Sequence, residues 1–342
     1  MTQYIIKRLL AAIPTIFFVS VIIFCLMRLI PGDVVEKLAI SDGGSAPSDE
    51  FLDQRRVELG LDRSWPHQYK CWALGDAFNN IEAIGGCEGG GLLRGDLGDS
   101  LRTSASINDL IKARLPLSIE LVVMAMLLAP ALAVPLGIIS AVKQDSPIDY
   151  GARLFTVLGL SGPDFVWGTL LILFLTVYLD DVTFGAIHSW LPPLYEPLFD
   201  NPWANFQALI LAALIIGYRL SAISARMMRS TMLEVLREDY VRTARAKGLA
   251  ERPVILKHAL RNAVIPVLTI MAGQITFLFG GTVIVEQIFR LPGLGRLTLE
   301  SVRIGDYPVV QATVLLMSVV FILVNLVVDL MYGIIDPRIR YS

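Results

Sequence analysis

Apolar and polar residues follow one another along the chain in long blocks, and six blocks are apolar over the length of a membrane span. A helix needs roughly 20 apolar residues to cross a hydrocarbon core of about 30 Å. The blocks that meet or approach this length are roughly residues 9–30, 116–142, 153–179, 206–224, 264–289 and 309–333. The fourth is the weakest, because Arg219 interrupts its C-terminal end. The pattern predicts an all-α polytopic membrane protein with six transmembrane helices.

The first apolar block differs from a secretory signal peptide, although Lys7 and Arg8 precede it. Its length of roughly 22 residues exceeds a typical signal-peptide core, and no small-residue cleavage site follows it. We therefore expect a retained helix. On this basis residues 1–30 form a tail and the first transmembrane helix, residues 31–115 form a small extracytoplasmic domain, and residues 116–342 form a core of five further transmembrane helices.

Composition supports the membrane assignment and argues against an enzyme. The chain is 54% hydrophobic and 18% charged, whereas a soluble protein usually carries about 25% charged residues. It contains no G-x-x-x-x-G-K-[ST], G-x-S-x-G or HExxH motif, so we expect neither a catalytic site nor a cofactor in this chain. Three cysteines and three histidines show no metal-binding spacing. A net charge of −2 indicates no particular partner, and nucleic acid is not expected.

The distribution of basic residues predicts the orientation in the membrane. Cytoplasmic loops are enriched in Lys and Arg, and residues 219–262 contain ten basic residues against four acidic ones. Residues 31–116 contain nine basic and fourteen acidic residues. Six spans with both termini in the cytoplasm are consistent with this distribution.

The expected extracytoplasmic domain contains a predicted helix and a pair of cysteines. Residues 49–59 predict a short helix that ends before Gly60. Cys71 and Cys87 enclose a Gly-rich loop on the oxidising side of the membrane, where a disulfide would stabilise the loop by about 3 kcal/mol. The alternative is two unrelated small residues, and a metal site is disfavoured because only His67 lies nearby.

Polar residues recur every seven positions in two predicted spans, which places them on one helical face. They are Gln311, Ser318 and Asn325 in the last span, and Asn262, Thr269 and Thr276 in the fifth. Such a face lines a substrate path or packs against another helix, and the pattern leaves both open. Asp164 follows Pro163, which kinks a helix, whereas Glu120 and Glu286 near outer ends are expected to be interfacial. Our candidates for the translocation path are Asp164, Thr269, Thr276, Ser318 and Asn325.

Residues 230–262 are too polar to span a membrane and predict two short amphipathic helices. The first is expected from about Thr231 to Lys247, with Gly248 as its C-terminal cap, and the second starts near Pro253. An ordinary basic loop that satisfies the positive-inside rule is one interpretation. The other is a docking site, because small residues beside arginines let another protein approach the backbone and pair its acidic groups.

Several motifs resemble one family. EDYVRTARAKGL at 238–249, followed by KHALRNAVIP at 257–266, is similar to the coupling-loop region of ABC importer permeases of the oligopeptide/dipeptide class. The same family is resembled, in the expected order, by RLIPGD at 28–33, GDLGDS at 95–100, RLPLSIEL at 114–121, EQIFRLPGLGRL at 286–297 and DPRIR at 336–340. The resemblance covers nearly the whole chain and is to the first permease subunit of such systems.

Three departures accompany the resemblance. Arg242, Thr243 and Ala244 stand where the general family pattern has Glu-Ala-Ala, a difference that is common in the peptide branch. The outer domain carries an insertion at roughly 73–90, and residues 264–266 match the end of the loop pattern only loosely.

The resemblance implies a permease core, residues 116–342, in the inner membrane of a prokaryote, paired with a second homologous permease as a heterodimer. It also implies two cytoplasmic ATPase subunits, which would bind ATP and Mg, and an extracytoplasmic substrate-binding protein. Helices within 231–262 would couple the permease to the ATPases. The coupling residues so implied are Glu238, Asp239, Tyr240, Arg242, Thr243, Ala244, Arg245, Ala246, Lys247 and Gly248.

The resemblance favours di- or oligopeptides as substrates, although related systems carry nickel chelates, glutathione or oligosaccharides. Two other classes compete with the importer. An ATP-independent secondary transporter or channel for a small solute would normally show charged relay residues or an inverted repeat, and a membrane scaffold would suit the long outer domain. Neither class requires the basic two-helix segment.

Overall fold

The computed structural model describes residues 2–29, 49–58, 60–78, 87, 90–182 and 192–335, and within these ranges it contains helices and turns but no β-strand. The all-α prediction is confirmed. The chain divides into two compact units, which we describe separately. One unit comprises Leu117–Pro292 and Val324–Ser342, and the other comprises Thr2–Pro116 and Gly293–Leu323.

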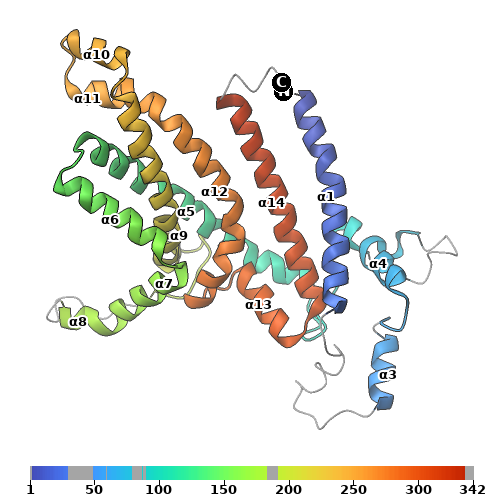
Figure 1. Ribbon diagram of the computed structural model, residues 1–342. Helices are drawn as coiled ribbons and strands as arrows, with labels where there is room; N and C mark the ends of the chain where they lie inside the picture. Colours follow the sequence, from blue (N-terminus) through green and yellow to red (C-terminus); the bar gives the residue numbers. More distant parts are fainter. Residues whose placement is uncertain are drawn as a thin grey trace. The chain divides into compact units, whose positions relative to one another are not determined.

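Among the described residues, five stretches are long and apolar enough to cross a membrane, and a sixth candidate is a bent pair of helices. The apolar stretches are Arg8–Leu29 of α1 (Thr2–Leu29), α5 (Ile107–Val142), α9 (Pro202–Val235), Glu251–Gln274, which ends within α12 (Leu260–Ile288), and Tyr307–Val328 of α14 (Tyr307–Ile335). All five overlap the predicted blocks, and Figure 1 shows the helices that carry them.

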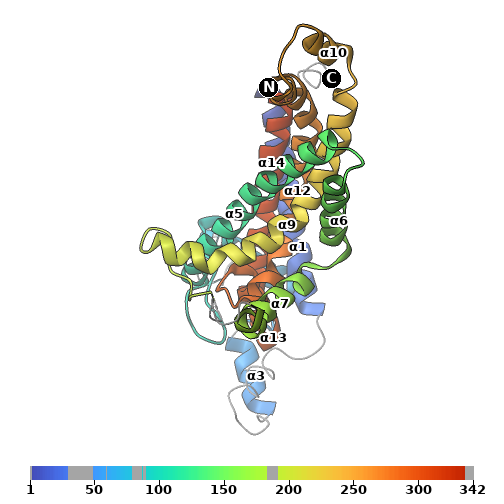
Figure 2. The same cartoon turned by 90° about the vertical axis from the view of Figure 1, so that its left-hand side faces the viewer.

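The third predicted span is not one helix. It consists of α6 (Pro147–Ser161) and α7 (Asp164–Leu173), which are bent by 108° relative to each other, followed by a π-helical turn, Phe174–Tyr178, and α8 (Leu179–Val182). Gly162 and Pro163 both have extended backbone at the break. Proline lacks an amide hydrogen and interrupts the helical hydrogen bonds, so the predicted kink becomes the sharp corner in Figure 2.

The polar segment after the fourth span also differs from the prediction. α9 continues to Val235, α10 covers only Asp239–Ala246, and α11 covers Glu251–Pro253. A π-helical turn, Val254–Ala259, then runs directly into α12. The prediction of a single helix from Thr231 to Lys247 was therefore wrong. A helix does start near Pro253, as predicted, but it runs on into α12 instead of remaining a short amphipathic helix between two spans.

Buried residues of α9 hold the larger unit together. Its N-terminal half packs against α5 and α12 in a cluster that includes Leu121, Leu209 and Val285. Its other half forms a second cluster in which Met228 and Met232 contact the first turns of α12. Burial of each such side chain contributes about 1.5–3 kcal/mol, which explains why α9 extends beyond its most apolar part.

The second unit contains α1, the short helix α13 (Leu294–Ile304) and the described residues between α1 and α5. We call these residues, 49–106, the outer segment, after the side of the membrane predicted for them. The outer segment contains α3 (Asp49–Glu58), α4 (Trp65–Leu74) and two short turns of 3₁₀ helix, Gly75–Phe78 and Leu92–Arg94. α4 packs on α1, where the Tyr69 hydroxyl lies 2.7 Å from Ser20 Oγ and Arg28 Nε donates to Gln68 Oε1 at 2.8 Å.

Glycine and a disulfide fix the loop that follows α4. Cys71 and Cys87 form a disulfide with a Cα–Cα distance of 5.1 Å. Gly91 has φ +68°, and a Cβ there would lie 2.3 Å from the backbone nitrogen of Gly75. Only glycine permits this close approach. The described part of the Gly-rich region is therefore held against the end of α4.

Candidate functional site

The polar segment, defined as residues 236–262, folds around three buried apolar side chains. Val241 and Ala244 of α10 pack against Val254, and the end of α9 covers them. Val241 and Val254 have no exposed surface. α10 is therefore held by one apolar face and presents its other face outward, away from the rest of the segment.

Most residues predicted to couple to an ATPase lie on the outward face of α10 or at its ends. The exposed ones are Glu238, Asp239, Tyr240, Arg242, Thr243, Arg245, Ala246, Lys247 and Gly248. The Arg242 side chain is 70% exposed and lies 3.5 Å from Asp239 Oδ1. Ala244 is instead buried against Val254. The other two small residues beside the arginines, Ala246 and Gly248, are exposed.

Polar contacts tie α10 to the elements around it. Arg245 donates to both carboxylate oxygens of Glu251, at 2.8 and 3.3 Å. Asn262 Nδ2 donates to the Tyr240 hydroxyl at 2.8 Å. Gly248 has φ +80° in the turn between α10 and α11, a conformation that costs other residues energy. The two side-chain contacts and the turn at Gly248 set the orientation of α10 relative to α11 and α12.

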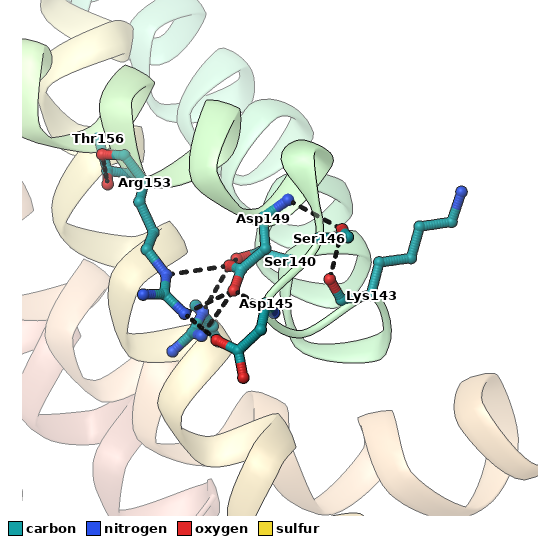
Figure 3. A network of polar contacts seen from close by, with 8 residues as sticks. Ser140, Lys143, Asp145, Ser146, Asp149, Arg153 and Thr156 are labelled. Carbon is teal, nitrogen blue, oxygen red and sulfur yellow. Dashed lines mark hydrogen bonds and ion pairs between the residues drawn. The ribbon is translucent and has the colours of Figure 1, made fainter.

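A buried carboxylate connects the adjoining helix ends (Figure 3). Asp149, in the first turn of α6, is completely buried. Arg229 of α9 donates to its two oxygens, each at 2.9 Å, and Arg153 donates at 3.2 and 2.6 Å. The Ser140 hydroxyl of α5 and the Asp145 backbone amide also donate to it. Asp149 thus joins α5, the turn after α5, α6 and α9.

The same stretch of α9 contacts the start of α12. Met228 and Met232 are fully buried against Ala259 and Ala263, and the Thr231 hydroxyl donates to the Ala263 carbonyl at 2.9 Å. A continuous set of contacts therefore leads from α10 through the end of α9 to α6 and α12. Asp149 was not among the predicted site residues, because it lies in a polar stretch of the sequence and its partner Arg229 is 80 residues away.

Asp164 is the first residue of α7 and forms an ion pair with Arg219. Arg219 NH1 lies 3.1 Å from Asp164 Oδ2, and the side chains are 57% and 15% exposed, respectively. The second oxygen, Oδ1, is buried and has no hydrogen-bond partner among the described residues. The sequence singled out Asp164 and noted Arg219 as an interruption of the next span, but it gave no sign that the two residues meet.

The other path candidates lie in α12 and α14. Thr269 is exposed, and its hydroxyl donates to the carbonyl four residues earlier at 3.1 Å. The hydroxyl of Ser318, which is half-buried, does the same at 2.8 Å. Asn325 is half-buried, and the side chain of Thr276 lies outside the described residues. These positions leave both the path and the helix-packing interpretations open.

Two acidic residues near the outer ends of spans are not simply interfacial. Glu286 is completely buried and accepts a hydrogen bond from Ser118 at 2.8 Å. Glu120 Oε2 accepts from Asn205 at 2.7 Å and from the Tyr195 hydroxyl at 3.2 Å. Burial and the negative charge of Glu120 raise the pKa of Tyr195 to about 12. Glu286 is thus a buried polar site that the sequence pattern did not reveal.

In the outer segment, a ring nitrogen of His67 lies within 4.8 Å of the sulfur atoms of Cys71 and Cys87. Because these sulfurs are bonded to each other, neither is the thiolate that binds metals. His67 Nε2 lies 2.8 Å from Arg63 NH1 in a hydrogen bond. Residues 79–86 and 88–89 of the predicted insertion, and the motif at 336–340, lie outside the described residues.

Comparisons with known proteins identify the family of the chain. Residues 133–341 match the family described as binding-protein-dependent transport system inner membrane component. Residues 1–122 match the N-terminal region of such membrane components. The chain belongs to this family of multi-pass inner-membrane permeases.

Relatives match over their full length. The glutathione transport system permease protein GsiC of Pectobacterium atrosepticum is 40% identical over 342 residues, covering 100% of both chains. A putative peptide transport system permease protein of Brucella abortus is 39% identical over 343 residues, again covering 100% of both chains. GsiC of Escherichia coli K12 is 39% identical over 342 residues, with the same coverage.

A solved structure shows the same fold. A chain of the MetNI methionine ABC transporter, in an inward-facing conformation, matches with a TM-score of 0.50 and 14% identity. The match covers 66% of this chain and 96% of that one. Membership of the family favours the importer over the ATP-independent transporter, channel or scaffold considered from the sequence. A permease of this family works with a second permease, an ATPase and a binding protein.

Proposed function

We propose that this permease forms half of a translocation path for di- or oligopeptides and that its polar segment binds a cytoplasmic ATPase subunit. A second, homologous permease supplies the other half as a heterodimer, and an extracytoplasmic binding protein delivers the substrate. Two ATPase subunits bind ATP and Mg²⁺, and both termini of this chain lie in the cytoplasm. The names of the relatives, which specify peptide and glutathione transport, support a peptide-like substrate.

The geometry of α10 is the observation that carries this proposal. Its apolar face is anchored by Val241 and Val254, while a row of charged side chains including Arg242 faces away from the chain. Exposed charges of this kind are expected at a docking surface, where complementary charges determine the register of the partners. A rigidly held helix also transmits displacement better than a loop.

The contacts around Asp149 give the displacement a route into the membrane. When the ATPase dimer closes, it would move α10 together with the end of α9, since the two share the buried cluster around Val241. Arg229 on α9 would then carry α6 with it through Asp149. The nucleotide state thereby shifts the balance between two conformations of the permease, because the ATPase binds one of them better.

Arg242→Glu tests the docking site with little effect on the chain itself, because Arg242 is exposed and, among the described residues, its side chain pairs only with Asp239, at 3.5 Å. The complete complex is purified in mild detergent through a tag on this chain, and its subunits are quantified by mass spectrometry. We expect wild type to retain two ATPases and a second permease. Arg242→Glu should lose the ATPases and keep the second permease.

Arg56→Glu is a matched control, since Arg56 also forms an exposed i,i+3 pair, with Asp53, but on α3 of the outer segment. It should leave ATPase retention unchanged. Arg245→Glu is less clean, because it also breaks the contact with Glu251, and Glu251→Gln measures that loss separately. If Arg242→Glu retains the ATPases and their stimulation by substrate, α10 is not the docking site.

A further inference from the structure

The ion pair between Asp164 and Arg219 lies beside the corner between α6 and α7. α6 and α9 run side by side, joined by Asp149–Arg229 at one level and by the Tyr218 hydroxyl, which donates to the Phe155 carbonyl at 2.7 Å, at another. Beyond the last turn of α6, at the corner with α7, Arg219 of α9 meets Asp164 at 3.1 Å. The charged pair therefore lies at the opposite end of α6 from Asp149.

Arg219 lies near the middle of α9 (Pro202–Val235), a helix that is long and apolar enough to cross a membrane. It precedes Arg229 by ten positions in one continuous helix, which corresponds to about 15 Å at 1.5 Å per residue. This is about half of a 30 Å hydrocarbon core. A charged side chain at this depth is costly if it faces lipid, and such residues usually face protein or water.

Arg219 is also exposed in this chain, and two of the three residues that follow it on the same face of α9 are polar. Residues 223, 226 and 230 lie on that face, at spacings of four, seven and eleven. Ile223 is half-buried, whereas Arg226 and Ser230 are exposed. A face with two arginines and a serine is unsuited to lipid. It suits a hydrated path that runs from the middle of α9 to the polar segment.

The pair has hydrogen-bonding capacity left for a ligand. Asp164 Oδ1 is buried and has no partner in the part of the chain that the structure describes, and Arg219 contacts Asp164 through NH1 while 57% of its side chain stays exposed. A guanidinium binds a carboxylate through two parallel hydrogen bonds, and a carboxylate accepts from an ammonium group. Two opposite charges side by side match the two charged ends of a zwitterion.

We propose that Arg219 and Asp164 form a transient binding site on the translocation path for a zwitterionic substrate. Arg219 binds the substrate carboxylate, and Asp164 binds its ammonium group. The inference rests on the proposed function, since it assigns a substrate class to the path of that same permease. It adds a residue, Arg219, that lies in an apolar span and was not among the path candidates.

The first test asks whether Arg219 faces water, and it requires neither substrate nor ATPase activity. In a background with Cys25→Ser, Arg219→Cys is exposed to a water-soluble methanethiosulfonate reagent in the assembled complex in membranes. Leu127→Cys is the matched control, because Leu127 is 67% exposed on the apolar stretch of α5. We expect rapid labelling at 219 and little at 127. Equal, slow labelling at both positions would overturn the proposal.

The second test separates a binding site from a structural ion pair. Transport of radiolabelled dialanine and glutathione is measured in proteoliposomes that contain the full complex. Arg219→Gln should reduce transport about tenfold, the loss expected for one hydrogen bond to a charged group. Arg226→Gln, which removes the same charge from the same face, should reduce it much less. Equal losses in these two variants would overturn the proposal.

The exchanged pair, Asp164→Arg with Arg219→Asp, preserves the attraction but reverses the charges that a ligand meets. We expect its assembly and thermal stability to match those of wild type, while transport stays reduced as in Arg219→Gln. Full transport by the exchanged pair would show that the ion pair is only structural. Failure of the proposed function is recognised independently, because the wild-type complex would then show no ATPase activity stimulated by dialanine or glutathione. The labelling result would still decide whether Arg219 faces water.

Discussion

Asp149 shows how one buried side chain holds several helix ends. Its carboxylate accepts hydrogen bonds from Arg153, Arg229, Ser140 and the Asp145 amide, with no exposed surface of its own. A buried charge is tolerated only when it is paired and its remaining lone pairs are satisfied. Removal of the charge therefore affects the two arginines as well as the carboxylate.

Asp149→Asn should destabilise the permease by an amount at the lower end of about 3–5 kcal/mol, the range for loss of one member of a buried ion pair. The lower end is expected because Arg153 is 40% exposed and regains water. Thermal unfolding of the purified complex in detergent measures the change. Asp145→Asn is the control, since Asp145 is 64% exposed in its pair with Arg153, and it should cost less than about 1 kcal/mol. Similar losses in both variants would contradict this interpretation.

Asp96 stabilises the outer segment through backbone contacts that depend on pH. Its carboxylate accepts from the amide of Gly98 at 3.0 Å and from that of Gly90 at 2.8 Å, and these hydrogen bonds lower the pKa of Asp96 in the folded protein. A carboxyl group with a lowered folded-state pKa contributes stability above its unfolded pKa, about 3.9. That contribution disappears as the pH falls through the lower folded-state value.

Hydrogen exchange should detect this loss at residues 90–98. We expect protection of the Gly90 and Gly98 amides to be constant above about pH 5 and to fall below about pH 4, after correction for the intrinsic exchange rate. In Asp96→Asn the protection should be lower at neutral pH and should no longer depend on acid. A wild-type profile that is flat through the acidic range would rule out a stabilising role for Asp96.

At the residue scale, the sequence found the charges that stand out against an apolar background and missed those in polar surroundings. Asp164 was recognised because it interrupts a span, and it does have a specific partner, Arg219. Asp149 looks solvated in the sequence, and only the fold brings Arg229 to it. Glu286 was missed for a related reason, since burial at the end of a span is set by neighbouring helices.

At the scale of elements, α10 is a helix of eight residues whose orientation depends on its ends. An isolated helix of this length is not stable in water, so the buried cluster around Val241 must hold it. At its C-terminal end the chain turns at Gly248, with φ +80°, toward α11. A change in this turn should alter where α10 points without removing any side-chain contact.

Gly248→Val should therefore weaken coupling more than it weakens folding. A β-branched residue in this conformation costs at least about 1–2 kcal/mol, and a shift of the turn relieves the strain. There is space for the new side chain, because a Cβ at Gly248 would meet no atom within 4 Å. We expect ATPase activity that substrate no longer stimulates, in a complex that still assembles.

Two substitutions control for the Gly248 experiment. Gly248→Asn should retain most of the coupling, since asparagine tolerates the left-handed conformation better than valine does. Gly151→Ala, at a glycine of α6 with equally open surroundings but without a positive φ, should have no effect on coupling. If Gly248→Val preserves substrate-stimulated ATPase activity, the orientation of α10 does not matter for coupling.

Element positions were predictable where length and apolarity decide them, and not where packing does. All the apolar blocks correspond to helices or to the bent pair. The angle at Pro163 was not predictable, because proline allows a bend and the neighbouring helices determine its size. The length of α9 was not predictable either. Arg219 and Arg229 interrupt the apolar pattern in the sequence, whereas the burial of Met228 and Met232 favours continuation of the helix to Val235.

At the scale of the whole molecule, the order of motifs identified the family, whereas orientation in the membrane remains a prediction based on charge. The basic polar segment is assigned to the cytoplasm, and the segment with Cys71 and Cys87 to the outer side. The disulfide between these cysteines is consistent with that assignment, because disulfides persist in the periplasm and are rare in the cytosol. It also provides a direct test.

In intact spheroplasts, a membrane-impermeant maleimide should label wild-type protein only after an impermeant reductant has opened the disulfide. The label should then disappear in the double variant Cys71→Ser with Cys87→Ser, which leaves only Cys25 within α1. Arg242→Cys, placed in that serine background, should be labelled only after the membrane is permeabilised. Labelling of Arg242→Cys in intact spheroplasts would show that the orientation in the membrane is opposite to the predicted one. The polar segment would then face the binding protein instead of the ATPase, and the coupling route through Asp149 would lose its driving partner.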